Sequence, residues 1–211
     1  MSKSAIILAG GLSTRFGKDK GLLLLANKPL IKYVLDVIKS LVDERLVIVS
    51  SESQAKNYLE TVVSDVKVFV DRQDTRGPLV GALTGFEEAQ GESSLLVPCD
   101  TPFVSREVVT LLFELCAGKT AVIPRWPNSC IEPLQAVYHT KSALDAAREA
   151  VGKCELNMQG MTTRLRGVRY VSTLVLQQLD PDLRTFLNVN SALDLRKAEA
   201  MLKRSAVFRM R

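Results

Sequence analysis

Residues 5–20 read AIILAGGLSTRFGKDK, and this stretch decides how the chain folds. The apolar run at residues 5–9 predicts a buried strand, because it is short, rich in branched side chains and ended by two glycines. Glycines let backbone N–H groups approach a bound anion closely, and Arg15, Lys18 and Lys20 add positive charge. A strand that opens into such a loop predicts a phosphate site at the carboxyl edge of an α/β sheet.

The spacing of the glycines excludes two common phosphate-binding motifs. A Walker A loop has four residues between its first glycine and Gly-Lys-Ser/Thr. Here five residues separate Gly11 from Gly17, and neither Ser nor Thr follows the lysine. The dinucleotide fingerprint G-x-G-x-x-G also fails, because Gly10 and Gly11 are adjacent. The remaining pattern, L-A-G-G-x-S-x-R-x-G-x-x-K at residues 8–20, resembles the signature loop of nucleotidyltransferases, which join a nucleoside triphosphate to a phosphorylated acceptor.

Composition and charge restrict the class of protein. The 211 residues are 46% hydrophobic and 24% charged, which is typical of a globular protein with a sizeable core. The net charge of +5 suits an anionic ligand but is small for a nucleic-acid-binding protein. Four widely spaced cysteines and one histidine favour reduced, mostly buried thiols over zinc or redox chemistry. With no signal peptide or membrane span apparent, we expect a cytoplasmic protein without a membrane or nucleic-acid partner.

Strands and helices alternate along the first half of the chain. Strands are expected at residues 5–9, 46–49, 66–70 and 94–97. Helices are expected at residues 29–41, 53–62 and 77–89, with Ser51 as the cap of the second. This alternation with short connectors favours an α/β fold with a doubly wound, mostly parallel (Rossmann-like) sheet flanked by helices.

The second half of the chain is less regular. Its expected elements are helices at 105–116 and 141–151, strands at 120–123 and 134–138, a lid or ordered loop at 124–133, a short strand end at 186–190 and a closing helix capped at Ser191. We expect a single nucleotidyltransferase domain over residues 1–211, with a nucleotide-binding half at 1–104 and an acceptor-binding half at 105–211.

Two aspartates occupy positions suited to metal chemistry. Asp71 and Asp100 each follow an apolar strand, so both should project at the same edge as the glycine-rich loop. Mg²⁺ bound to phosphate oxygens takes only one or two protein carboxylates. Asp100 is the expected ligand, because a buried strand precedes it and Pro102 restricts the chain after it. For Asp71, a turn-capping role is equally compatible with the sequence.

A specific family resemblance comes from several motifs in one order. These are the loop at 8–20, Lys28-Pro29-Leu30, Gly77-Pro78-Leu79, Pro98-Cys99-Asp100-Thr101-Pro102 and the segment 186–190. Together they resemble the molybdenum cofactor guanylyltransferases over essentially the whole chain. Members of that family transfer GMP from GTP to the terminal phosphate of molybdopterin, giving the guanine dinucleotide cofactor and pyrophosphate. Cytidylyl relatives tend to have Ala-Ala-Gly at residues 9–11 and usually lack Gly-Pro-Leu, so the resemblance favours guanine.

The resemblance implies roles for individual residues. The implied nucleotide contacts are Leu8, Ala9, Gly10, Gly11, Lys20, Ser50, Asp71 and Asp100, with Asp100 also the Mg²⁺ ligand. Asn188 and Asn190 match an Asn-Val-Asn pair associated with the acceptor, for which turn chemistry before a helix is the alternative. Ser50 or Ser51 stands where the family often has a base-contacting asparagine, and serine does not imitate an amide. Glu132 would repel a polyanionic acceptor if it faced the site.

The implied mechanism requires no catalytic base, because a phosphate monoester is already ionised at neutral pH. The acceptor phosphate attacks the α-phosphorus of GTP, while Arg15, Lys20 and the loop amides hold the triphosphate and Mg²⁺ on Asp100 neutralises charge. The expected partners are GTP, molybdopterin and the enzymes that supply or receive the cofactor. Two alternatives stay open: a nucleotidyltransferase that uses CTP or another phosphorylated acceptor, such as a sugar phosphate, and a GTP- or nucleic-acid-binding regulatory module without catalysis.

Overall fold

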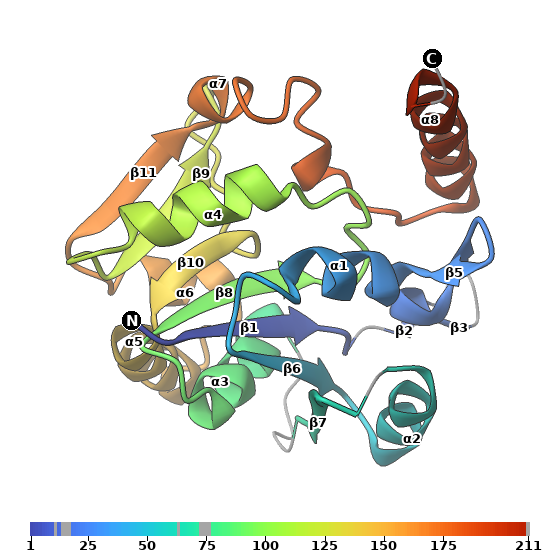
Figure 1. Cartoon of the computed structure of the whole chain (residues 1–211). Coiled ribbons are helices and arrows are strands. Elements are labelled where there is room, and N and C mark those ends of the chain that lie inside the picture. Colours follow the sequence, from blue (N-terminus) through green and yellow to red (C-terminus); the bar gives the residue numbers. More distant parts are fainter. Residues whose placement is uncertain (11, 14–17, 63, 72–76, 210–211) are drawn as a thin grey trace.

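The computed structural model describes residues 1–10, 12–13, 18–62, 64–71 and 77–209. Among these residues, seven strands form one sheet in the order β11-β9-β10-β8-β1-β6-β7 (Figure 1). The strands are β1 (Lys3–Leu8), β6 (Glu44–Val49), β7 (Val66–Val70), β8 (Ser93–Pro98), β9 (Ala121–Arg125), β10 (Ala136–His139) and β11 (Val168–Ser172). The predicted mostly parallel, doubly wound sheet is confirmed.

The first strand lies in the middle of this sheet. β1 pairs in parallel with β6 on one side and with β8 on the other, so that Ile6 is opposite both Leu46 and Leu96. β6 with β7 and β9 with β11 are also parallel pairs, whereas β10 runs antiparallel to β8 and β9. A strand that is covered on both faces reads as a continuous apolar run, which explains the sequence of β1. The chain therefore leaves β1 at the centre of the carboxyl edge.

Helices cover both faces of the sheet (Figure 1). Ala5 and Ile7 belong to one core with α1 (Leu30–Ile38), α2 (Glu52–Thr61) and α4 (Arg106–Leu115). Ile6 belongs to the opposite core with α3 (Pro78–Glu88), α5 (Thr140–Gly152) and α6 (Met158–Thr162). Successive side chains of a strand point to opposite faces, so one apolar run serves both cores.

A third, smaller apolar cluster joins the two ends of the chain. Leu25 of β4 (Leu24–Leu25), Leu30, Val189 and Ala198 of α8 (Ala192–Arg209) are all buried together. β4 forms a hairpin with β5 (Lys28–Pro29), and α8 stands beside this hairpin at the side of the molecule (Figure 1). The cluster brings the segment that precedes α8 next to the segment that follows the glycine-rich loop.

The structure corrects several sequence-based predictions. The expected strand end at 186–190 is wrong: Arg184–Phe186 form a 3₁₀ helix, η2, and Val189 N–H donates to the carbonyl of Asp100 (2.9 Å) instead of to a strand ladder. The expectation that the thiols are mostly buried holds for only two of the four cysteines: Cys99 and Cys116 are buried, whereas Cys130 and Cys154 are exposed. Elements too short for a periodic pattern were missed, namely β2 (Leu12–Ser13), β3 (Lys18–Asp19), η1 (Lys20–Leu22), β4, β5, α6 and α7 (Thr173–Leu176), together with β11.

The predicted helix caps are confirmed. Ser51 Oγ accepts a hydrogen bond from Gln54 N–H (3.2 Å), and Ser191 Oγ accepts one from Asp194 N–H (3.2 Å). These bonds satisfy N–H groups that have no partner within the first helical turn. Of the helices that the structure describes, none combines the length and apolar character needed to span a membrane.

Glu44, at the start of β6, holds the amino edge of the sheet together. Its Oε1 accepts hydrogen bonds from Ser4 Oγ (2.5 Å) and from the backbone N–H groups of Gln90 (2.5 Å) and Gly91 (3.2 Å). Its Oε2 lies 3.3 Å from Lys67 Nζ. Burial acts to raise the pKa of this carboxyl, but the hydrogen bonds outweigh burial and hold the pKa below its ordinary value.

We expect Glu44→Gln to lower the free energy of unfolding by about 1–3 kcal/mol at neutral pH, because hydrogen bonds to a charged acceptor are lost. The folded-state pKa lies below the unfolded one, so the carboxylate contributes fully above about pH 4.3 and its contribution disappears as the pH falls through the folded value. Urea unfolding of both proteins between neutral and acidic pH measures this difference. A difference that does not shrink in acid would contradict the assignment.

Candidate active site

A cavity of about 590 Å³ opens at the carboxyl edge of the sheet. It lies where β1, β6 and β8 end and α3 begins, as expected for a ligand site of an open α/β sheet. The predicted site residues that line it are Leu8, Ala9, Gly10, Lys20, Ser50, Asp71 and Asp100. The fold thus brings together predicted site residues that are far apart in sequence, such as Leu8 and Asp100.

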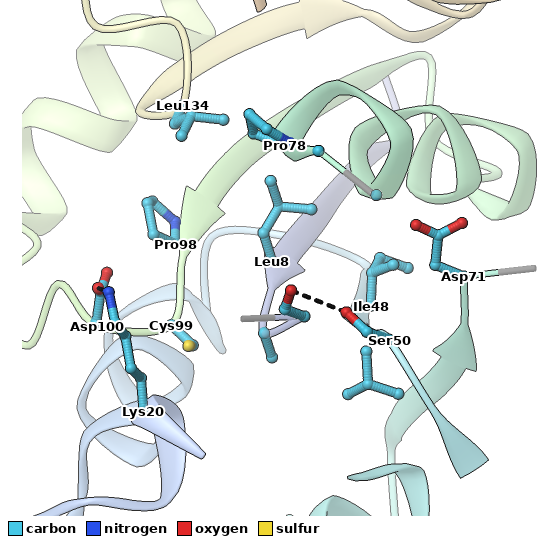
Figure 2. Close-up of a pocket in the computed structure, with 15 residues that line it drawn as sticks. Leu8, Lys20, Ile48, Ser50, Asp71, Pro78, Pro98, Cys99, Asp100 and Leu134 are labelled. Atoms are coloured by element: carbon cyan, nitrogen blue, oxygen red, sulfur yellow. Dashed lines mark hydrogen bonds and ion pairs between the residues drawn. The ribbon is translucent and has the colours of Figure 1, made fainter. Parts of the chain in front are cut away.

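The charged groups occupy two sides of this cavity. Figure 2 shows Lys20 and Asp100 on one side, Asp71 on the other, and Leu8 between them. Asp71 follows β7, its Oδ1 accepts a hydrogen bond from Thr84 Oγ1 of α3 (3.1 Å), and its N–H donates to Val49 O (2.8 Å). The Asp71 carboxylate is thereby fixed at the cavity by side-chain and backbone contacts.

Lys20 and Asp100 form an ion pair, with 3.3 Å between Lys20 Nζ and Asp100 Oδ2. The Asp100 side chain is only 8% exposed and that of Lys20 is 28% exposed. Burial raises the pKa of the Asp100 carboxyl, and the neighbouring ammonium of Lys20 opposes this in part. Within the part of the chain that the structure describes, the second oxygen of Asp100, Oδ1, is buried without a hydrogen-bond partner. A buried carboxylate with an unsatisfied oxygen can bind a further cation.

Ser50 lines the cavity beside the glycine-rich stretch. Its Oγ donates a hydrogen bond to the carbonyl of Gly10 (2.8 Å), which Figure 2 shows as a dashed line. A Cβ at position 10 would overlap Ser50 Oγ and lie 3.3 Å from Ser50 N. Glycine at position 10 therefore avoids a clash with the Ser50 side chain where β1 and β6 end.

Of the two predicted acceptor residues, Asn190 contacts the ion pair, and neither asparagine is among the residues that line the cavity. Asn190 Oδ1 accepts a hydrogen bond from Lys20 Nζ (2.6 Å), across 170 residues of sequence. Asn188 Oδ1 accepts one from Gln135 Nε2 (3.4 Å), and both asparagines are exposed on either side of buried Val189. This alternation is that of an extended segment, as the sequence predicted. The cap of the following helix is Ser191, not an asparagine.

Other predicted residues have different outcomes. Gly11 and Arg15 lie outside the residues that the structure describes. Glu132 is engaged within the 124–133 loop itself, because its Oε1 accepts a hydrogen bond from Trp126 Nε1 (2.6 Å). Trp126 in turn packs edge-to-face on Phe186, with 5.7 Å between ring centroids. The loop at 124–133 therefore contacts the segment that carries the two asparagines.

Sequence reasoning missed the apolar part of the cavity lining. The further lining residues are Ile48, Val49, Gly77, Pro78, Gly81, Pro98, Cys99 and Leu134. Most of them sit at the last positions of β6 and β8 or in the first turns of α3. Gly77, Pro78, Pro98 and Cys99 belong to the motifs that carry the family resemblance, although no contact was predicted for them. The other four had only their position next to the predicted edge as a signal, since apolar residues there also read as core.

Comparison with known proteins is consistent with this geometry. Residues 5–167 match the family described as the MobA-like NTP transferase domain. A probable molybdenum cofactor guanylyltransferase from Methanosarcina mazei is 33% identical over 198 residues, covering 92% of this chain and 88% of the relative. A molybdenum cofactor guanylyltransferase from Desulfosudis oleivorans is 31% identical over 201 residues, covering 95% of this chain and 96% of the relative.

Solved structures share the fold. The molybdopterin-guanine dinucleotide biosynthesis protein A of Archaeoglobus fulgidus superimposes with a TM-score of 0.81 at 27% identity, covering 95% of this chain and 99% of the other. The 2-C-methyl-D-erythritol 4-phosphate cytidylyltransferase of Thermus thermophilus has a TM-score of 0.70 at 17% identity, with 96% and 100% covered, and shares the fold alone. By sequence and fold, this chain is a nucleotidyltransferase that belongs to the MobA-like NTP transferase family, together with the molybdenum cofactor guanylyltransferases.

Proposed function

We propose that this chain transfers GMP from GTP to the terminal phosphate of molybdopterin, forming the guanine dinucleotide cofactor and releasing pyrophosphate. The observation that carries the proposal is the meeting of Lys20, Asp100 and Asn190 at one point of the cavity edge. A cation that would bind the donor phosphates, a buried carboxylate and an amide that would face the acceptor suit such a transfer. The names of the relatives that match nearly the whole chain support GTP and molybdopterin as the substrates.

The nucleotide is proposed to lie across the cavity. Its nucleoside would occupy the side formed by Ser50 and Asp71, over Leu8, and its phosphates would extend to Lys20. The Lys20 ammonium would then bind phosphate oxygens by charge-assisted hydrogen bonds. This orientation would bring the α-phosphate near the Lys20–Asp100 pair, which Asn190 also contacts.

Asp100 is the proposed residue for holding Mg²⁺, together with phosphate oxygens of the nucleotide. Its buried, unsatisfied Oδ1 and its carboxylate chemistry fit a hard cation that takes few protein ligands. Mg²⁺ bound there would supply neutralisation of the charge on the reacting phosphates. Asp100 would contribute by presenting a buried carboxylate just after the end of β8.

The rest of the proposed mechanism consists of holding the two substrates in place. The acceptor phosphate is already ionised, so the proposed transfer removes no proton from it. Asn188 and Asn190 would orient the acceptor, and Lys20 would stabilise charge on the donor phosphates in the transition state. The transferred phosphorus gains the bond to the acceptor oxygen and loses the bond to pyrophosphate.

The position of Lys20 depends on the next residue, Gly21. Gly21 is buried in η1 against Tyr58 of α2 and against Cys99, which precedes Asp100. A Cβ at position 21 would overlap Tyr58 Oη and lie 3.0 Å from Cys99 Sγ. Tyr58 is fully buried, so its ring has no room to withdraw. The missing side chain at position 21 therefore allows Lys20 to reach Asp100.

We expect Lys20→Ala and Asp100→Ala each to reduce turnover by about 10²–10³-fold, because each removes charge stabilisation that is required in the transition state. The assay is pyrophosphate release with saturating GTP, Mg²⁺ and molybdopterin, with circular dichroism to verify folding. Lys56→Ala, which removes an exposed lysine of α2, is the matched control and should keep wild-type turnover. Near-normal turnover in either site variant would contradict the proposed roles.

We expect GTP with Mg²⁺ to stabilise the protein more than CTP, ATP or UTP does. A ligand at about 100 times its dissociation constant adds roughly 2.7 kcal/mol to the free energy of unfolding, which a thermal-shift measurement resolves. Each nucleotide is compared with and without Mg²⁺. A larger shift with CTP would retain the nucleotidyltransferase activity but replace the proposed product.

We expect Gly21→Ala to destabilise the fold by about 1–3 kcal/mol and to lower turnover, because the added methyl group overpacks against Tyr58 and displaces Lys20. Adding Tyr58→Phe, which removes the overlapping oxygen, should recover part of both losses. Gly152→Ala is the control, since a Cβ there meets no described atom within 4 Å. Thermal unfolding and pyrophosphate release measure the effects, and equal behaviour of the two alanine variants would refute the explanation.

A further inference from the structure

A buried glutamine connects the two sides of the cavity. The side chain of Gln54, in the first turn of α2, is only 5% exposed. Its Oε1 accepts a hydrogen bond from Ser50 N–H (2.8 Å), and its Nε2 donates to Asp19 Oδ1. A buried amide must be hydrogen-bonded to offset its loss of water, and Gln54 achieves this with one partner from each side.

Both partners of Gln54 are adjacent to groups of the proposed nucleotide site. Ser50 lines the cavity and is hydrogen-bonded to Gly10 O. Asp19 immediately precedes Lys20, whose ammonium lies at Asp100 on the opposite side. The single side chain of Gln54 therefore spans from the end of β6 to the start of η1.

The geometry of Asp19 shows that this contact is specific. Asp19 is the residue before the 3₁₀ helix η1, a position where aspartate commonly caps the helix, yet its side chain makes no capping hydrogen bond. Its Oδ1 is instead bound to Gln54. The backbone of Gln54 is itself fixed, because its N–H donates to Ser51 Oγ at the cap of α2. The bridge thus connects two segments that are each anchored to the sheet or to a helix.

We propose that Gln54 is a positioning residue that sets the separation between Ser50 and the Lys20 ammonium, so that GTP meets its nucleoside and phosphate contacts simultaneously. The inference rests on the proposed function and extends it to a residue outside the cavity lining. A displacement of about 1 Å in such a site can reduce the rate by about 10²-fold, so a fixed spacing matters for catalysis. Loss of the bond to Asp19 frees the start of η1 and weakens contacts with the phosphates, whereas on the nucleoside side Ser50 keeps its hydrogen bond to Gly10 O.

The polarity of the bridge allows a reciprocal test. Gln54→Glu retains the acceptor for Ser50 N–H but places a second carboxylate against Asp19, and like charges repel. Combining Gln54→Glu with Asp19→Asn supplies an amide donor at position 19 for the new carboxylate. The double variant therefore keeps the hydrogen bond from Ser50 N–H and restores the bond between residues 54 and 19 with donor and acceptor exchanged. Gln54→Met removes both hydrogen bonds with a side chain of similar volume. Asp19→Ala removes the other partner of the bridge, Asp19, which is half-buried.

The experiment compares these variants by calorimetric titration with GTP and with guanosine, and by kcat and KM for GTP with molybdopterin. In Gln54→Met, Gln54→Glu and Asp19→Ala we expect the ratio of the Kd for GTP to the Kd for guanosine to rise about tenfold, with a fall in kcat of at least that size. The Gln54→Glu and Asp19→Asn double variant should recover most of both. Gln178→Met, at an exposed glutamine, is the matched control and should leave both quantities unchanged.

The outcomes separate this inference from the proposed function. If wild-type protein binds GTP and turns over, but single variants keep the wild-type Kd ratio and kcat, Gln54 has no positioning role and the proposed function stands. A loss in single variants that the double variant does not recover also overturns the inference, because it indicates general damage to α2. Wild-type protein that neither binds GTP nor releases pyrophosphate overturns the proposed function and this inference with it.

Discussion

The burial of one carboxylate, that of Asp100, is the constraint on which the rest of the site depends. A carboxylate that is removed from water must find a cation or take up a proton, and here Lys20 Nζ lies 3.3 Å away. The Lys20 ammonium reaches the end of β8 because the next residue, Gly21, has no side chain and packs directly against Tyr58. Lys20 and Asp100 also hold the segment that precedes α8. Asn190 Oδ1 accepts a hydrogen bond from Lys20, and Val189 N–H donates one to the Asp100 carbonyl.

The sheet order explains why these groups meet. β1 lies between β6 and β8, so the glycine-rich stretch, Ser50 and Asp100 all emerge next to one another at the carboxyl edge. The three strands are buried on both faces and provide rigid ends, which suits a reaction that relies on positioning and not on proton transfer. The bridge through Gln54 adds a side-chain connection between the end of β6 and the start of η1.

The acceptor side depends on contacts that are more distant in the chain. Trp126 of the 124–133 loop packs on Phe186, and Gln135, which directly precedes β10, contacts Asn188. These contacts hold the segment before α8 across the sheet edge, although it has no strand partner. Its conformation follows from packing in the small cluster around Val189, and not from local backbone preference.

The amino-acid sequence was enough to predict the strands and helices with strong periodicity, the mostly parallel sheet and the cavity positions of Lys20, Asp71 and Asp100. Those features depend on short-range patterns: apolar runs, glycines at a turn and aspartates at strand ends. Only the tertiary structure decided that Asn190 meets Lys20, that Gln54 joins Ser50 to Asp19, and that residues 186–190 form no strand. These features depend on side chains brought together across 35 to 170 residues, and no local pattern encodes such contacts.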